Sequence, residues 1–419
     1  MSKKTISFLF FLTFLTIYYF GSFSKISFGD CIGFVLDVEN RIFVKDFMPL
    51  THFLYINTAV FFSKFLHVDS VVVMRMMSVI PAALTVSFLF LLIKEFLEEN
   101  WIAIAATTVF GLCFTFWRSA ETVEVYTFNA LFVIVFLLFS VKALKKDSRL
   151  HLALAGVILG LSLWVHIQNI MLIPAYFLLL YMSKSGREKV AMSLILFILI
   201  FSVMFAVNHM KGFEMKYVFT SKKGPWVQNT MNQSFFDLAT GIIRAVLYLI
   251  YNFNVFILFS VSGLIYLYKY FKREALFLFV ASLFTLGFAT FYAVSDNYVY
   301  FIPFYLSFAV YVASGIKKLS SSFPLRKLWL TPLLTPLFYI FSMYLISVTP
   351  EGKEFHDKKL YKGGLDYYML PWLYHNIGCI EFTLDNGKTE DDVEAMKAAS
   401  NEFIKLRRKY QPLEEIRKL

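Results

Sequence analysis

The sequence predicts an all-α protein that crosses a membrane many times. Of its 419 residues, 58% are hydrophobic and only 16% are charged, and the mean hydropathy is +0.63. A soluble globular domain carries about 25% charged residues, so this composition indicates an integral membrane protein. Apolar runs of roughly 20 residues recur between short charged loops, a length that suits transmembrane helices better than barrel strands.

About eleven apolar segments are long enough to be transmembrane helices. They are residues 5–23, 71–93, 101–116, 127–143, 151–166, 168–183, 190–208, 243–268, 274–293, 298–316 and 328–348. The fifth and sixth are short and nearly continuous, which predicts a tight hairpin around residues 166–169. Residues 49–67 are apolar but interrupted, so we expect them to lie in the membrane interface. The first segment resembles a signal peptide without a small-residue cleavage site, which predicts an uncleaved helix.

Basic residues predict the orientation, because cytoplasmic loops are enriched in Lys and Arg. If Met1 is cytoplasmic, the inner loops contain Lys142, Lys145, Lys146, Arg149, Lys184, Arg187, Lys189, Lys269, Lys272, Arg273, Lys317, Lys318, Arg326 and Lys327. The short outer loops 117–126, 166–168 and 294–297 contain Arg118 as their one basic residue. The net charge of +11 therefore reflects membrane orientation, and nucleic-acid binding is not expected.

This topology divides the chain into a transmembrane domain, residues 1–348, and an extracytoplasmic tail, residues 349–419. Two outer loops are long, at about residues 24–70 and 209–242. The tail is expected to contain a helix at about 390–410, because acidic residues begin it and basic residues end it, as suits a helix dipole.

The three cysteines, Cys31, Cys113 and Cys379, are spaced too widely for a zinc ribbon. Cys31 and Cys379 fall on the same predicted side of the membrane, so a disulfide between them stays an alternative. We expect free thiols. We predict no metal site, and leave open weak assistance of the chemistry by a divalent ion.

The predicted outer face collects polar side chains at the membrane boundary. Residues 116–129 contribute Arg118, Glu121, Glu124, Tyr126 and Asn129. Ionisable groups at this depth are costly unless they pair, meet water or take part in chemistry. The other candidate site residues on this face are Asp30, Asp37, His52, Arg75, His166, Arg244 and Asp296.

Each candidate also has a structural explanation. Asp30 could be a turn or N-cap residue. Glu121 and Glu124 share a helical face and could pair with Arg118, and His166 could be a hydrogen-bonded interfacial histidine. Together they favour chemistry on a membrane-borne substrate, since a carboxylate can deprotonate an acceptor hydroxyl and an arginine can bind a departing phosphate through two N–H groups.

The motif stretch resembles a known family. The residues that carry the resemblance are Trp117…Ala120…Glu124-Val125-Tyr126…Asn129, with Asp30 and Gly33, Pro49-Leu50-Thr51-His52-Phe53-Leu54-Tyr55, Gly160-Leu161-Ser162…His166 and Asp296…Tyr298…Tyr300-Phe301-Ile302-Pro303. The family consists of polytopic GT-C glycosyltransferases related to protein O-mannosyltransferases, and includes bacterial members and an animal endoplasmic-reticulum enzyme. The similarity covers about residues 5–316 and is strongest at 110–135.

The resemblance implies a GT-C-like helical bundle that transfers a sugar from a polyprenyl-phosphate carrier to an acceptor and inverts the anomeric configuration. Mannose is the expected sugar. Asp30 would be the base and Glu124 the second acid, which orients the acceptor or the sugar. The remaining candidates would bind substrate: Arg118, with Arg75 or Arg244, would hold the lipid phosphate, and Asp37, His52, Glu121, Tyr126, Asn129, His166 and Asp296 would line the cleft.

The first loop departs from the family pattern. The family shows an acidic pair around a glycine, roughly Asp-x-Gly-Glu, whereas Asp30 is followed by Cys31-Ile32-Gly33-Phe34. Either Asp37 or Glu39 therefore takes the second acidic role, or the protein uses one carboxylate there.

The expected partners are a polyprenyl-phosphate sugar, a protein or glycan acceptor and membrane lipids, with no cofactor besides the lipid-linked donor. The expected location is a bacterial inner membrane with a periplasmic site, and an endoplasmic-reticulum membrane is the alternative. Three other functions stay open: a lipid or glycan transporter, a transferase for a phospho-group or acyl chain, and a non-catalytic partner subunit.

Overall fold

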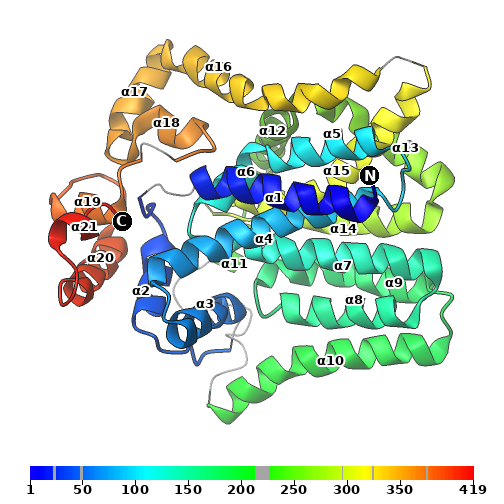
Figure 1. The fold of residues 1–419 in the computed structure, drawn as a ribbon, viewed down its shortest axis with the longest axis horizontal. Helices are drawn as coiled ribbons and strands as arrows, with labels where there is room; N and C mark the ends of the chain where they lie inside the picture. Colours follow the sequence, from blue (N-terminus) through cyan, green and yellow to red (C-terminus); the bar gives the residue numbers. More distant parts are fainter. Residues whose placement is uncertain (22–24, 48–50, 213–225, 295, 323–324, 374–375) are drawn as a thin grey trace.

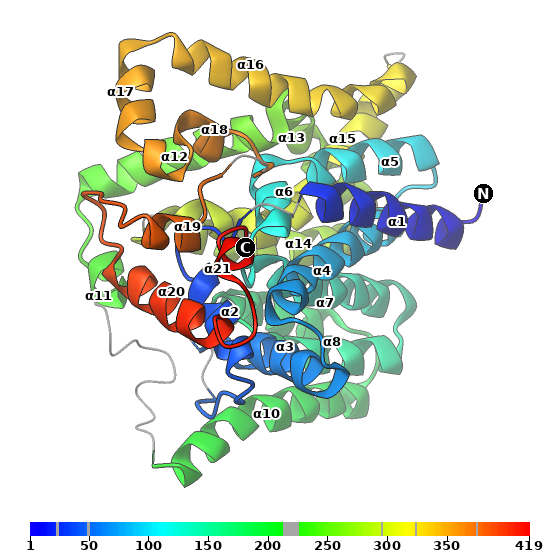
Figure 2. The same ribbon diagram turned by 60° about the vertical axis from the view of Figure 1, so that its left-hand side comes forward.

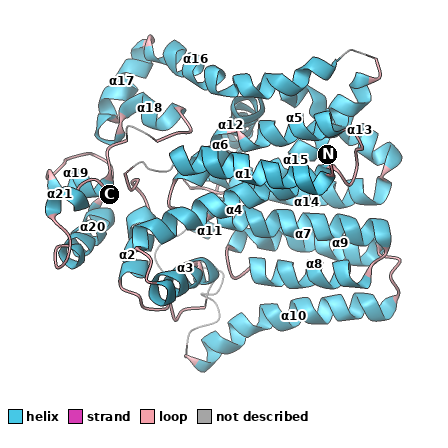
Figure 3. Cartoon of the chain, viewed as in Figure 1, coloured by secondary structure: helices cyan, strands magenta, loops and turns pink. Residues whose placement is uncertain are grey.

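The computed structural model describes residues 1–419 except 22–24, 48–50, 213–225, 295, 323–324 and 374–375. Every regular element in this described part is a helix, as Figure 3 shows. Eight of its helical segments are long and apolar enough to cross a membrane, or nine with one bent pair. The prediction of an all-α, multi-pass membrane protein is confirmed, while eleven spans stay a prediction.

The candidate spans follow the sequence prediction closely. Their helices are α1 (Lys3–Gly21), α4 (Ser70–Ile93), α7 (Tyr126–Lys146), α10 (Arg187–Met210), α12 (Phe235–Phe253) continuing into α13 (Ile257–Tyr270), α14 (Lys272–Phe291), α15 (Ile302–Ser320) and α16 (Thr335–Ser347). Shorter apolar helices are α3 (Phe53–Leu66), α8 (Arg149–Ser162) and α9 (Ile173–Met182), the last preceded by a 3₁₀ turn at Ile167–Leu172. The break between α8 and α9 lies at the predicted position, next to His166.

The segment predicted as one span at 101–116 is instead a bent pair. Its halves, α5 (Asn100–Gly111) and α6 (Phe114–Glu121), meet at 60°. Polar side chains from other helices satisfy the broken backbone: Tyr339 donates to the Leu112 carbonyl at 3.0 Å, and Asn252 accepts from the Thr115 amide at 2.8 Å. Interrupted helices are tolerated at membrane depth only with such partners. The bend redirects the motif residues across the end of the bundle.

Helix α15 forms the centre of the bundle. In the apolar 18-residue window within Asn297–Ser320, 94% of residues are buried, against 17% in the corresponding window of Arg187–Met210, so α10 faces lipid. Two glycines let α13 and α15 touch: a Cβ at Gly263 would lie 1.7 Å from the Tyr311 carbonyl oxygen, and one at Gly315 would lie 1.9 Å from that of Phe259. Small residues of this kind are the usual means of close helix packing in membranes.

The first loop and the tail meet at the end of the bundle that lies away from the N-terminus (Figures 1 and 2). This end contains α2 (Cys31–Glu39), α11 (Trp226–Met231), α17 (Pro350–Lys358), α18 (Gly364–Met369), α19 (Cys379–Leu384), α20 (Glu394–Arg407) and α21 (Leu413–Ile416). Backbone hydrogen bonds join the two regions, from the Ile26 amide to the Leu419 carbonyl at 2.6 Å and from the Cys379 amide to the Ile26 carbonyl at 2.9 Å. Helix α20 occupies most of the segment predicted as a tail helix.

Candidate active site

Glu124 lies on the short link between α6 and α7. Ser78, which is buried on α4, holds the backbone of this link, since its hydroxyl lies 3.3 Å from the Glu124 carbonyl oxygen and 3.4 Å from the Glu124 amide. Thr127 donates in turn to the Ser78 carbonyl at 2.9 Å. The position of Glu124 is therefore set by α4, which is one of the central helices.

The Glu124 carboxylate faces the first loop. Its Oε1 atom lies 3.5 Å from the Cys31 Sγ atom, which donates to it, and a Cβ at Gly29 would lie 4.0 Å from the same oxygen. Burial, followed by the negative charges of Asp30 and Asp296, raises the pKa of Glu124 well above its ordinary value. The charges of Asp30 and Asp296, from distant parts of the chain, thus act on Glu124.

Asp30 directly precedes α2, but its side chain makes no capping hydrogen bond to that helix, and the residue is exposed. The N-cap explanation is therefore not what the structure shows. Gly29 has a φ of 104°, a conformation that favours glycine and turns the chain into α2 immediately before the carboxylate. The Asp30 carboxylate is left open to a substrate.

Asp296 directly precedes the 3₁₀ turn Asn297–Phe301 that leads into α15. It too makes no side-chain capping bond to that turn, and it accepts a hydrogen bond from the Tyr126 hydroxyl. Loss of hydration within the site, and then the charge of Asp30, raise the pKa of Asp296. Among the described residues, no three His, Cys, Asp or Glu side chains are grouped closely enough to hold a metal ion, and metal dependence stays a prediction.

Four rings pack beside the acids. His52 and His166 stack with their centroids 5.3 Å apart, and Tyr126 and Tyr300 each lie within 6 Å of His166, at 5.9 and 5.6 Å. The backbone amide of Gln168 donates to the His166 Nδ1 atom at 3.2 Å, which leaves Nε2 to carry the proton. Burial lowers the pKa of both histidines, so this wall is uncharged near neutral pH.

Two motif residues that sequence reasoning placed in the cleft instead bind the tail. Arg118 is buried; it donates to the carbonyl oxygens of Tyr367 and, at 3.3 Å, Leu370, and its guanidinium lies 4.2 Å from the Tyr367 ring centroid. Glu121 accepts from the Trp117 indole at 2.6 Å and from the Leu373 amide at 3.1 Å. The polar groups of Arg118 and Glu121 are thus occupied by the tail and are not available to a substrate beside Asp30.

The first-loop alternatives for a second acid also face the tail. Asp37 lies two turns beyond Asp30 on α2, where burial, followed by the charge of Glu402 on α20, raises its pKa. Glu39 accepts from Ser70 at 2.5 Å and pairs with Arg407 at 2.9 Å. The acids that do lie near Asp30 are Glu124 and Asp296.

Two more predicted residues, Arg75 and Asn129, have structural contacts as well. Arg75 donates to the Leu419 carbonyl at 3.5 Å. Asn129 accepts from the Asn169 side chain at 2.6 Å, and that amide also donates to the Ser162 carbonyl at 2.9 Å. Asn129 therefore fastens α7 to the α8–α9 hairpin, behind the ring wall.

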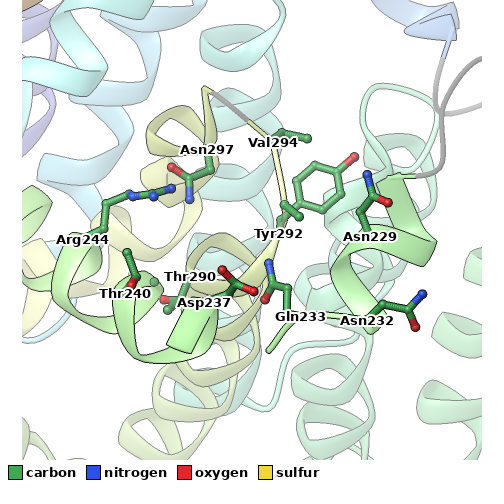
Figure 4. Close-up of a pocket in the computed structure, with 12 residues that line it drawn as sticks. Asn229, Asn232, Gln233, Asp237, Thr240, Arg244, Thr290, Tyr292, Val294 and Asn297 are labelled. Carbon is green, nitrogen blue, oxygen red and sulfur yellow. The ribbon is translucent and has the colours of Figure 1, made fainter. Parts of the chain in front are cut away.

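A polar pocket of about 440 Å³ adjoins Asp296 (Figure 4). It is lined by Asn229, Asn232, Gln233, Asp237, Thr240, Gly241, Arg244, Thr290, Tyr292, Ala293, Val294 and Asn297. Arg244 is exposed here and forms no ion pair with any acid of the described residues. The Oε1 atom of Gln233 is buried and has no hydrogen-bond partner among the described residues, which marks an unfilled acceptor beside the pocket.

Comparison with known proteins agrees with this architecture. Residues 51–189 match the family model for the N-terminal domain of protein O-mannosyl-transferase TMEM260, a range that contains the whole motif stretch. ArnT from Cupriavidus metallidurans has a similar fold in the apo state, with a TM-score of 0.59 at 12% identity over 81% of this chain and 64% of ArnT. The chain has the GT-C fold.

Two further solved structures share the GT-C fold with this chain. Cupriavidus metallidurans ArnT bound to undecaprenyl phosphate gives a TM-score of 0.58 at 11% identity over 83% of this chain and 66% of ArnT. The apo oligosaccharyltransferase of Archaeoglobus fulgidus gives 0.52 at 12% identity over 85% of this chain and 59% of its own. The chain thus spans slightly less than two thirds of the length of these proteins. No curated protein sequence matches it.

The sequence analysis named Asp30, Glu124 and Asp296 as candidates, and of the pocket beside them it named Arg244 but not the polar residues of the second long loop. Asn229, Asn232 and Gln233 belong to the second long loop, where the sequence offers only a polar cluster before an amphipathic helix. That cluster was the available signal. The cluster lines a pocket because α11 is held at the end of α14, where the Ala293 amide donates to the Thr230 hydroxyl at 3.1 Å. The sequence does not show that contact.

Proposed function

We propose that the protein is a membrane glycosyltransferase that moves a sugar, with mannose as the expected sugar, from a polyprenyl-phosphate carrier to an acceptor hydroxyl on the non-cytoplasmic face. The observation that carries this proposal is the meeting of Asp30, uncapped and exposed, with Glu124 and Asp296 at one end of a GT-C bundle. The structure of ArnT with undecaprenyl phosphate supports the proposed donor class.

Asp30 is the proposed base. As the acceptor oxygen attacks the anomeric carbon, Asp30 takes the hydroxyl proton, the bond from that carbon to the phosphate oxygen breaks, and the phosphate leaves with the electron pair on its carrier lipid. Attack opposite the leaving group inverts the anomeric carbon. Glu124, whose raised pKa favours its protonated form, then donates a hydrogen bond to a sugar or acceptor oxygen.

Arg244 is the arginine best placed to hold the phosphate. Arg118 and Arg75 both contact the tail, whereas Arg244 is exposed in a pocket next to Asp296. A guanidinium can donate two parallel hydrogen bonds to a phosphate. The amides and hydroxyls around it suit the hydroxyl groups of a sugar, so the donor headgroup is assigned to this pocket.

The test uses purified protein in nanodiscs with radiolabelled polyprenyl-phosphate-mannose and a membrane extract as the acceptor source. Wild type is compared with Asp30→Asn and with Asp37→Asn, a matched control on α2, the helix that follows Asp30, at a position near Glu402 of the tail. Label should reach a new product with wild type and Asp37→Asn but not with Asp30→Asn. Transfer by Asp30→Asn would remove the base assignment. Absence of transfer from a full panel of carrier-linked sugars would favour a non-catalytic subunit.

A further inference from the structure

A second pocket lies at the other end of the bundle, where the chain passes from α9 to α10. It measures about 610 Å³, and its walls include the apolar side chains of Leu180, Val190 and Leu194 and the cationic side chains of Lys184 and Arg187. In Figure 1 this link is on the side of the N-terminus, away from α2 and the tail. The pocket is therefore separate from the proposed catalytic site.

The two cations of this pocket are free to meet an anion. Lys184 and Arg187 are exposed, and neither is paired with an acid in the part of the chain that the structure describes. The nearby carboxylate of Asp147 is already used, because its Oδ1 atom lies 3.4 Å from Arg273 and accepts the Lys184 backbone amide at 3.2 Å. Glu188, the acid in the first turn of α10, forms no ion pair with either cation within the described part of the chain, so the pocket has two unpaired positive charges.

The start of α10 adds backbone donors to the two cations. Helix α10 begins after Gly186, which lines the pocket, has a φ of 84° and offers no side-chain cap. The first amides of the helix are therefore available to an anion.

The apolar wall continues into the surface that faces lipid. Along α10, Ile195, Ile198 and Leu199 are 55%, 49% and 56% exposed, and Tyr181 at the end of α9 is 88% exposed. A cationic rim above an apolar wall matches a ligand with a phosphate headgroup and a hydrocarbon chain. A free phosphate ion would use the rim but not Val190 or Leu194.

We propose that this pocket is a binding site for an anionic phospholipid. Lys184, Arg187 and the first amides of α10 hold the headgroup phosphate, and an acyl chain lies along Val190 and Leu194. Each basic residue near a membrane surface contributes favourably to binding of anionic lipid. The pocket thereby anchors α10, which shares few buried residues with the rest of the bundle.

The experiment measures phosphatidylglycerol that remains bound when the full-length protein is extracted from vesicles of phosphatidylcholine and phosphatidylglycerol, read by native mass spectrometry. Wild type should retain the lipid, and the double variant Lys184→Gln/Arg187→Gln should retain it at least about tenfold less, since two basic contacts are lost. Val190→Trp, which fills the pocket but keeps both charges, should also lose it.

The matched control is Lys269→Gln/Lys272→Gln, which removes the same charge from the basic end outside the pocket and should retain the lipid. Equal loss in both double variants would overturn the proposal in favour of a general surface charge. Displacement of the lipid by equimolar inorganic phosphate would indicate a free-anion site instead. Absence of retained phosphatidylglycerol in wild type would also overturn it.

Discussion

Glu121 and Glu124 stand three residues apart in one motif, yet their surroundings differ completely. Both carboxylate oxygens of Glu121 accept a hydrogen bond, from Trp117 at 2.6 Å and from the Leu373 amide at 3.1 Å. Glu124 accepts from the weak S–H donor of Cys31 at 3.5 Å and from the neighbouring Val125 backbone amide, and it lies near two other acids. An ionisable group that binds a distant part of the chain stabilises the fold, whereas one held beside like charges is a candidate for chemistry.

The arginines show the same difference. Arg118 is buried under the tail with its guanidinium against carbonyl oxygens and the Tyr367 ring. Arg244 is exposed in a polar pocket and has no ion-pair partner among the described residues. The polar end of the bundle therefore has two parts. The structural half consists of Arg118 and Glu121, whose side chains bind the tail. The open half consists of Asp30, Glu124, Asp296 and Arg244.

The largest effect is expected at Asp30, in the open half. Asp30→Asn should lower the rate of sugar transfer by about 10²–10⁴-fold, the usual contribution of a general base. It should leave the thermal unfolding midpoint unchanged, because the side chain is exposed and caps nothing. Single-turnover transfer and thermal unfolding in nanodiscs measure the two. A fall in the midpoint with intact transfer would assign Asp30 to the structural half.

Arg244→Gln and Arg118→Gln make the same substitution in the open half and in the structural half, so their effects can be compared directly. Loss of a charge-assisted contact to phosphate is worth about 1.5–3 kcal/mol, so Arg244→Gln should raise the KM for the donor by roughly 10- to 100-fold. Its unfolding midpoint should stay near that of wild type. Arg118→Gln should do the reverse, with a lower midpoint and a smaller change in donor KM. Donor titration and thermal unfolding of both variants check this. A larger rise in donor KM for Arg118→Gln than for Arg244→Gln would return the role of phosphate ligand to Arg118.

The sequence predicted the fold class because hydropathy and loop charge report directly on membrane crossing. It also predicted that Asp30, Glu124 and Asp296 share one end of the bundle, because each follows or precedes an apolar span. It did not predict the roles of Arg118 and Glu121, since their partners Tyr367 and Leu373 lie about 250 residues away in a tail without a recognisable motif. Local pattern shows that an ionisable group needs a partner and does not show which one.

The 60° bend between α5 and α6 escaped prediction for a related reason. Residues 101–116 form one apolar run without proline, and its single glycine, Gly111, at which α5 ends, does not by itself predict a bend. The bend depends on Tyr339 and Asn252, which reach the open backbone from other helices. The bend matters for function because it aims α6, and therefore the link that holds Glu124, across the end of the bundle.

Glu121→Gln tests the structural half directly. The substitution turns one acceptor into an amide, which can satisfy the Trp117 indole but meets the Leu373 amide as a second donor. Leaving a buried donor unsatisfied costs about 1–3 kcal/mol, so the free energy of unfolding should fall by that amount. Trp117→Phe, which removes the other partner, is the control and should give a loss of similar kind. Chemical unfolding followed by far-UV circular dichroism measures both, and an unchanged free energy would contradict the role of this contact.

The smallest expected effect is a change in how stability depends on pH at Glu124. Burial, followed by the charges of Asp30 and Asp296, raises its folded pKa above the unfolded value, so between the two values the folded protein binds more protons than the unfolded chain. The contribution of Glu124 to the free energy of unfolding is therefore fully present below its unfolded pKa, and it is lost as the pH rises toward its folded pKa. Glu124→Gln removes that loss, so the variant should unfold at a slightly higher temperature than wild type near neutral pH.

The same argument requires the two proteins to converge in acid, where Glu124 is protonated in both the folded and the unfolded chain. Unfolding midpoints of wild type and Glu124→Gln, measured in nanodiscs from neutral pH to below the ordinary glutamate pKa, give the difference at each pH. A Glu124→Gln difference that stayed constant with pH would contradict the raised folded pKa of Glu124, and with it this account of the site.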